Sequence, residues 1–181
     1  MSIRRGLKQK TYDRSDVLTA AERAAGYRVL VELETQPAVT AALFYGPEDA
    51  DWMRRPRDDA AWVGRVWVTV DSESDVFIEN ADVETAHRGR GQRFGTLLYN
   101  LAVAYAYHVF GARRVAGQDP SHPARGVHRK LARLYGTRFR LWPVDGVPGA
   151  AQYLYPIKVA PRARLQRSRL PKSRHRRVPK S

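Results

Sequence analysis

The sequence predicts a single α/β domain built on a mixed sheet, and three observations support this fold class. The 181 residues suit one ordinary domain. Hydrophobic residues make up 43% of the chain, which is enough to form a core. Strand-like segments come first, followed by alternating helical and strand-like segments, the order typical of such a domain. We expect a basic segment with a short helix over 1–26, the folded domain over 27–159 and a tail over 160–181.

Local patterns predict each element of this domain. Helices are expected over 13–25, from about Gly95-Thr96 onward and over 123–135, and each is followed by a glycine that can end it, namely Gly26, Gly111 and Gly136. The polar stretch 48–60 is expected to be a surface loop or a broken helix. Alternating or β-branched segments predict strands over 27–34, 38–45, 62–70, 75–83, 113–117, 139–142 and 152–159.

The positive charge lies at the two ends of the chain. The formal net charge is +14, of which residues 160–181 carry +9 and residues 1–10 carry +4, so that the body is nearly neutral. The last 22 residues contain no acid, three prolines and few large apolar side chains, which predicts a disordered basic tail. Such a tail suits either salt-sensitive contact with nucleic acid or a solubilising extension.

The composition excludes several classes of site. The chain has no cysteine, which excludes disulfides, thiolate zinc sites, iron–sulfur clusters and cysteine nucleophiles, and we predict no metal site. No apolar run approaches the length of a membrane span, and residues 1–5 lack the apolar stretch of a signal peptide. We therefore expect a cytoplasmic protein without a membrane partner.

A basic, glycine-containing turn joins the strand that ends at Val83 to the following helix. Its residues are Arg88-Gly89-Arg90-Gly91, with Gly95-Thr96 at the expected helix start. Glycines allow close approach of the backbone, and the unpaired N–H groups of a helix start favour an anionic group. The turn therefore predicts a pyrophosphate site, to which Arg88, Arg90 and Arg93 can add charge. The alternative is a tight connection that uses glycine for steric reasons alone.

At this turn the sequence resembles the GNAT family of acetyltransferases. That family joins a central strand to a pyrophosphate-binding turn of the form Arg/Gln-x-x-Gly-x-Gly/Ala, and residues 88–91 fit its first four positions. The next small residue of the pattern is Arg93 here, so Gly95 fits only with Gln92-Arg93 as an insertion. The resemblance implies a GNAT-like fold with a mixed, mostly antiparallel central sheet flanked by helices, and acetyl-CoA as the cofactor.

A second match lies downstream, in the order that the family requires. The segment 121–131 is similar to the family's Asn-x-x-Ala-x-x-x-Tyr-x-Lys-Leu, with Ser121 in place of Asn and His128 in place of Tyr. That tyrosine often protonates the departing CoA thiolate, so the resemblance makes His128 a candidate general acid, a role that imidazole can fill near neutral pH. The alternatives are a histidine that packs or lies exposed, and Tyr135 as the acid. The two matches cover roughly residues 66–140.

The resemblance also implies a direct reaction, in which an acceptor amine attacks the acetyl-CoA thioester without a covalent acyl-enzyme. Glu79 is the first candidate for the base, through water, and Asp82 is the second. Strand alternation puts these two on opposite faces, so at most one should face the acceptor. The backbone N–H of Val83 is the family-like oxyanion donor. The expected cofactor contacts are Val83, Thr85, Arg88, Gly89, Arg90, Gly91, Gly95, Thr96 and Ser121.

The sequence does not identify the acceptor, which can be a small-molecule or a protein amine. A second class of function is a nucleic-acid-binding protein in which the domain is an inactive scaffold and residues 160–181 contact phosphates. A third is dinucleotide binding through Gly89-x-Gly91-x-x-x-Gly95, which is disfavoured because several strands precede this fingerprint.

Overall fold

The computed structural model describes residues 9–46, 62–88, 93–118 and 120–162. The strands expected over 27–83 are found at nearly the expected bounds, whereas the short first strand was not expected. The loop expected over 48–60 and most of the basic tail lie outside the described residues. The elements are β1 (Lys10–Asp13), a 3-10 turn (Ser15–Val17), α1 (Ala20–Ala24), β2 (Tyr27–Leu33), β3 (Ala38–Tyr45), β4 (Trp62–Val70), β5 (Asp75–Val83), α2 (Thr85–Arg88), α3 (Arg93–Phe110), β6 (Arg114–Gln118), α4 (His122–Leu134), β7 (Trp142–Pro143) and β8 (Ala151–Pro156).

The strands form one eight-stranded sheet in the order β1-β2-β3-β4-β5-β6-β8-β7. Every neighbouring pair is antiparallel except β5 and β6, which are parallel. The expected fold class, a mixed and mostly antiparallel sheet flanked by helices, is therefore confirmed. Among the described residues, no helix is long and apolar enough to cross a membrane.

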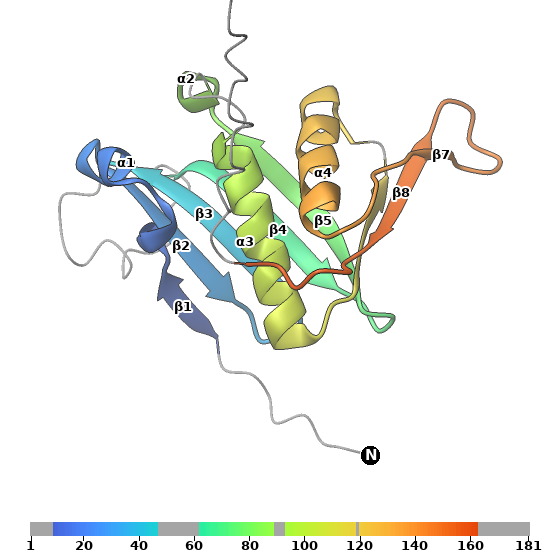
Figure 1. The fold of residues 1–181 in the computed structure, drawn as a ribbon, viewed down its shortest axis with the longest axis horizontal. Helices are drawn as coiled ribbons and strands as arrows, with labels where there is room; N and C mark the ends of the chain where they lie inside the picture. The colour runs from blue at the N-terminus through green and yellow to red at the C-terminus, as the bar shows by residue number, and fades with distance from the viewer. Residues whose placement is uncertain (1–8, 47–61, 89–92, 119, 163–181) are drawn as a thin grey trace, which may run out of the picture.

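The core lies between the sheet and two helices on one of its faces. In Figure 1, α3 crosses the middle of the sheet and α4 stands beside it on the same face. The alternate residues of β2, β3 and β4 that face α3, such as Val31, Leu43 and Val68, are fully buried. Gly26, Gly111 and Gly136 all have positive φ after their helices, as expected for helix ends. Helix α3 begins at Arg93, two residues earlier than expected.

The sheet opens between β5 and β6. These strands pair only through Asp75–Phe77 and Arg114–Ala116, whereas β5 continues to Val83 beside β4. The N–H of Glu84 bonds the carbonyl of Val63 in the direction of β4. Because main-chain groups alternate between the two sides of a strand, those of Ala81 and Val83 point to the other side, where the described residues provide no paired strand.

A β-bulge in β5 changes which face two acidic residues occupy. Trp67 pairs with Asn80 and Val68 pairs with Ile78, which leaves Glu79 as an extra residue. The Thr69 hydroxyl donates to Glu79 Oε1 at 2.6 Å, so Glu79 lies on the face away from the helices. Asp82 pairs with Arg65 on that same face. The expectation that strand alternation separates Glu79 and Asp82 is therefore wrong, because the bulge shifts the alternation by one residue.

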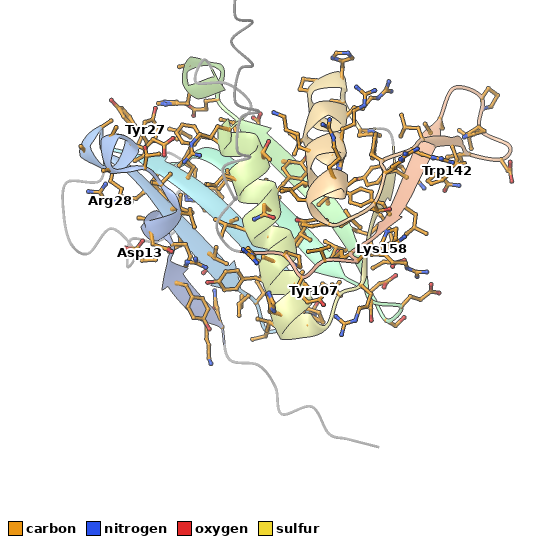
Figure 2. All side chains as sticks on the ribbon, viewed as in Figure 1. Asp13, Tyr27, Arg28, Tyr107, Trp142 and Lys158 are labelled. Atoms are coloured by element: carbon orange, nitrogen blue, oxygen red, sulfur yellow. The ribbon has the colours of Figure 1, made fainter. Side chains whose placement is uncertain are left out.

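The chain that follows β8 contacts both α3 and α4. The N–H of Lys158, labelled in Figure 2, donates to the carbonyl of Tyr135 just after α4. The segment then crosses α3, where the buried Asn100 side chain donates to the Arg162 carbonyl at 2.7 Å and accepts from the Tyr135 hydroxyl. His108 Nε2 lies 3.0 Å from the Pro161 carbonyl. Residues 160–162 of the expected tail thus contact the helix.

Candidate active site

A cavity of about 390 Å³ lies where β5 leaves β6. Its walls come from the end of β5, from α2 and from the first turns of α3 and α4. Most of its lining is apolar, and polar side chains reach it from Asp82, His87, Tyr99 and Ser121. The lining residues are Val66, Ala81, Asp82, Val83, His87, Phe94, Gly95, Tyr99, Ser121, Pro123, Ala124 and Val127.

Two helix starts make the cavity favourable for an anion. Helix α3 runs for 18 residues from Arg93 and α4 for 13 residues from His122, and the first turn of each lines the cavity. The positive dipole ends of both helices therefore lie at one space, with the unpaired N–H groups coming mainly from α3, because Pro123 has no N–H and the Ala124 N–H is bonded to the Ser121 side chain. Ser121 caps α4 by accepting from the Ala124 N–H at 3.4 Å, which leaves its hydroxyl proton for another acceptor.

Asp82 lies at the junction of this cavity with a second one. The second cavity, of about 320 Å³, lies on the sheet face opposite the helices and is lined by Trp62, Val63, Gly64, Arg65, Asn80, Asp82 and Glu84. Asp82 is the residue that the two linings share. Its Oδ1 accepts from the N–H of Val83 at 2.8 Å. A carboxylate oxygen therefore occupies the hydrogen-bonding position in front of the Val83 N–H.

The structure brings three of the expected cofactor contacts together. Val83, Gly95 and Ser121 line the cavity from three different elements. Thr96 follows Gly95 and is buried within α3. Thr85 and Arg88 belong to the short helix α2, whereas Gly89, Arg90 and Gly91 lie outside the described residues. Glu79 lines neither cavity, and its carboxylate is bonded to Thr69.

The two candidate acids lie behind the cavity wall. His128 is only 1% exposed, with Nδ1 2.8 Å from the Tyr155 hydroxyl and its ring packed against Phe139 and Tyr153. Burial lowers the pKa of His128 to about 4, so the imidazole is neutral at pH 7. Tyr135 is also buried, and its hydroxyl donates to Asn100. Neither residue lines the cavity.

Tyr99 is a cavity residue that the sequence did not suggest. It lines the cavity from α3, and its ring edge meets His128 at a centroid distance of 5.3 Å. Burial raises its pKa to about 12, so the phenol stays protonated at neutral pH. The Tyr99 hydroxyl forms no hydrogen bond within the described part of the chain. In that part, every fully buried side-chain polar atom has a hydrogen-bond partner, so the Tyr99 hydroxyl must be accessible to solvent. The two motif matches in the sequence assign no role to this position.

Arg93, at the start of α3, is bonded to an acidic residue of α1. Its guanidinium forms two hydrogen bonds to Glu22, with Nε 2.6 Å from Oε1 and Nη2 2.9 Å from Oε2. Beside this pair, the Tyr27 hydroxyl lies 2.8 Å from His87 Nδ1, and Tyr27 is labelled at the start of β2 in Figure 2. These contacts fix α2 and the start of α3 against the N-terminal part of the chain.

The comparisons with known proteins found likeness only among solved structures. No known family profile matches the chain, and no curated protein matches it. A structure from Klebsiella pneumoniae, described as an acyl-CoA N-acyltransferase, is 14% identical, with a TM-score of 0.46, over 82% of this chain and 97% of its own. An acetyltransferase of Bacillus subtilis in complex with CoA is 14% identical, with a TM-score of 0.43, over 66% and 77% of the two chains. A GNAT-family acetyltransferase of Staphylococcus aureus is 9% identical, with a TM-score of 0.40, over 77% and 75%. These are likenesses of fold at low identity.

Proposed function

We propose that this protein is an acetyl-CoA-dependent N-acetyltransferase that transfers the acetyl group directly to an acceptor amine. The observation that carries the proposal is the cavity at the open edge of β5, where Val83 meets the starts of α3 and α4. Acetyl-CoA has three parts that match this cavity. Its amide groups match the main chain of β5, its anionic diphosphate matches the start of α3, and its thioester would lie beside Val83.

The coenzyme would bind by main-chain contacts. The amides of its pantetheine arm can pair with the outward-facing groups of Ala81 and Val83, as an added strand pairs with a sheet edge. The diphosphate would lie at the start of α3, with Gly95 and the arginines of the turn 88–91 beside it. Ser121 at the start of α4 can donate a further hydrogen bond.

Three groups of the chain serve the transfer in this proposal. The amine nitrogen forms a bond to the thioester carbon, Asp82 takes the proton from that nitrogen, and the carbon–sulfur bond breaks to release CoA. The Val83 N–H stabilises the oxyanion once Asp82 turns from it toward the amine. The Tyr99 hydroxyl donates a hydrogen bond to the departing thiolate. We place Asp82 before Glu79 as the base because only Asp82 lines the cavity.

Calorimetry with acetyl-CoA tests the proposal directly. The full-length chain should bind one equivalent, and Arg88→Ala should weaken binding by about tenfold because a charge-assisted contact to the diphosphate is lost. Arg138→Ala is the matched control, since Arg138 is exposed and lines neither cavity. Absence of binding at millimolar acetyl-CoA, by a protein that circular dichroism shows to be folded, would overturn the proposal.

A further inference from the structure

Arg65 lines the second cavity and has no acidic partner among the residues that the structure describes. Its guanidinium carbon lies 4.7 Å from the centroid of the Trp62 ring, and the side chain is half-buried. Among the described residues it has no hydrogen-bond or ion-pair partner. Stacking on Trp62 holds the planar group in place, while its five N–H donors stay available. A guanidinium held in this way is suited to a carboxylate.

The register of the sheet places this cation opposite the acid at the site, but the two side chains turn to different partners. Arg65 stands directly opposite Asp82 on the same face, at a separation that would allow an ion pair. The guanidinium instead turns to Trp62, and the Asp82 carboxylate turns to the Val83 N–H. The second cavity therefore has a positive group and a negative group a short distance apart, with Asn80 beside them.

A simple amine would match only part of this cavity. A cationic amine can approach Asp82 and Glu84, but it leaves Arg65 without a counter-ion. An amine that also carries a carboxylate matches both groups. Because Asp82 lines both cavities, an amine held at Asp82 also lies next to Val83, where the proposed reaction takes place.

We propose, on the basis of the function proposed above, that the second cavity binds the acceptor and that the acceptor is a small amino carboxylate. Arg65 binds its carboxylate through the guanidinium, and Asp82 receives its amine. The nitrogen then attacks the thioester from the face of the sheet opposite the coenzyme cavity. Arg65 is thus the residue that determines which amines react.

Paired substrates test this assignment. The full-length protein with acetyl-CoA is assayed for CoA release with the standard L-amino acids and β-alanine, and with the carboxamide of each. We expect at least one acid to react with a kcat/KM at least tenfold above that of its own carboxamide. Arg65→Gln should lower kcat/KM for that acid by about 10- to 100-fold, mainly through KM, because a hydrogen bond to a charged group is lost. In Arg65→Gln, the kcat/KM for the carboxamide and the Kd of acetyl-CoA should be unaffected. The control Arg138→Gln should change kcat/KM for neither substrate.

The outcomes separate this inference from the function on which it rests. If acetyl-CoA binds and Arg65→Gln reacts with acids as the unaltered chain does, the assignment of Arg65 is overturned and the transferase proposal stands. Equal rates for acids and carboxamides, or turnover of none of these acids by protein that binds acetyl-CoA, also overturn the inference. Absence of acetyl-CoA binding overturns the proposed function itself.

Discussion

Gly95 lies in the first turn of α3, at the wall of the coenzyme cavity. A Cβ added there would meet only the Val127 side chain, at 3.8 Å, which is an ordinary contact. Gly95→Ala should therefore stabilise the protein by up to about 1 kcal/mol through helix propensity. The same methyl group occupies ligand space and should weaken acetyl-CoA binding by about tenfold. Thermal unfolding and calorimetry on one sample test both effects, and unchanged affinity would show that the coenzyme does not approach this turn.

Substitution of Asp82 tests whether it is the base of the proposed reaction. Asp82→Asn keeps an oxygen that can accept from the Val83 N–H, but it removes the group that takes the proton. We expect kcat to fall by about 100-fold and the Kd of acetyl-CoA to change little. Steady-state kinetics with an amine acceptor measure this, with the exposed Asp145→Asn as the control. If Glu79→Gln causes the loss and Asp82→Asn does not, Glu79 is the base.

Tyr99 carries the proposed contact to the leaving sulfur. Tyr99→Phe should lower kcat by about tenfold, because one hydrogen bond to a developing charge is removed. Folding stability should not fall, since the hydroxyl has no partner within the described residues. Tyr107→Phe on the same helix is the control, and Figure 2 labels Tyr107 near the far end of α3. A loss of stability with unchanged kcat would assign Tyr99 a packing role only.

At the scale of elements, one ion pair joins α1 to the start of α3. Arg93 holds the pKa of the Glu22 carboxyl at about 2, below its ordinary value of 4.5. Because the folded pKa is the lower one, the pair stabilises the protein fully above pH 4.5, and this contribution is lost as the pH falls toward 2. Arg93 is partly exposed, so we expect about 1 to 2 kcal/mol.

Glu22→Gln separates this effect from helix capping. Glu22 also closes the capping box of α1 with Thr19, and glutamine can fill that role. Denaturant unfolding should show the variant about 1 to 2 kcal/mol less stable at pH 7, with the difference shrinking toward zero near pH 2. A difference that stays constant from pH 7 to pH 2 would contradict the role of the carboxylate charge.

The sequence predicted most elements because their signals are local. Strand patterning located β2 to β5, and single glycines located the ends of α1, α3 and α4. The bulge at Glu79 has no such signal, since it arises from the pairing of β5 with β4. The pairing of Glu22 with Arg93, 71 positions apart, is likewise a product of the tertiary fold.

At the scale of the whole molecule, the sequence predicted which residues gather around the cavity better than it predicted the surroundings of the candidate acids and bases. Val83, Gly95 and Ser121 meet because the order of strand, turn, helix and second helix brings them to one edge of the sheet. The burial of His128 depends on aromatic residues of β8 and of the segment between α4 and β7, which motif matching does not include. The exposure of Asp82 to both faces depends on the open edge of β5, which strand alternation alone does not reveal.

The three-residue ladder between β5 and β6 has a mechanical consequence. The smaller part of the molecule, made of β6, α4 and β8, joins the larger one through this ladder, through contacts of α4 with α3 and through the chain at 157–162. Any change that weakens these contacts would widen the gap between β5 and β6 in which the coenzyme is proposed to lie. Asn100, which touches no reacting atom in this scheme, would then control how far the acetyl group lies from the incoming nitrogen.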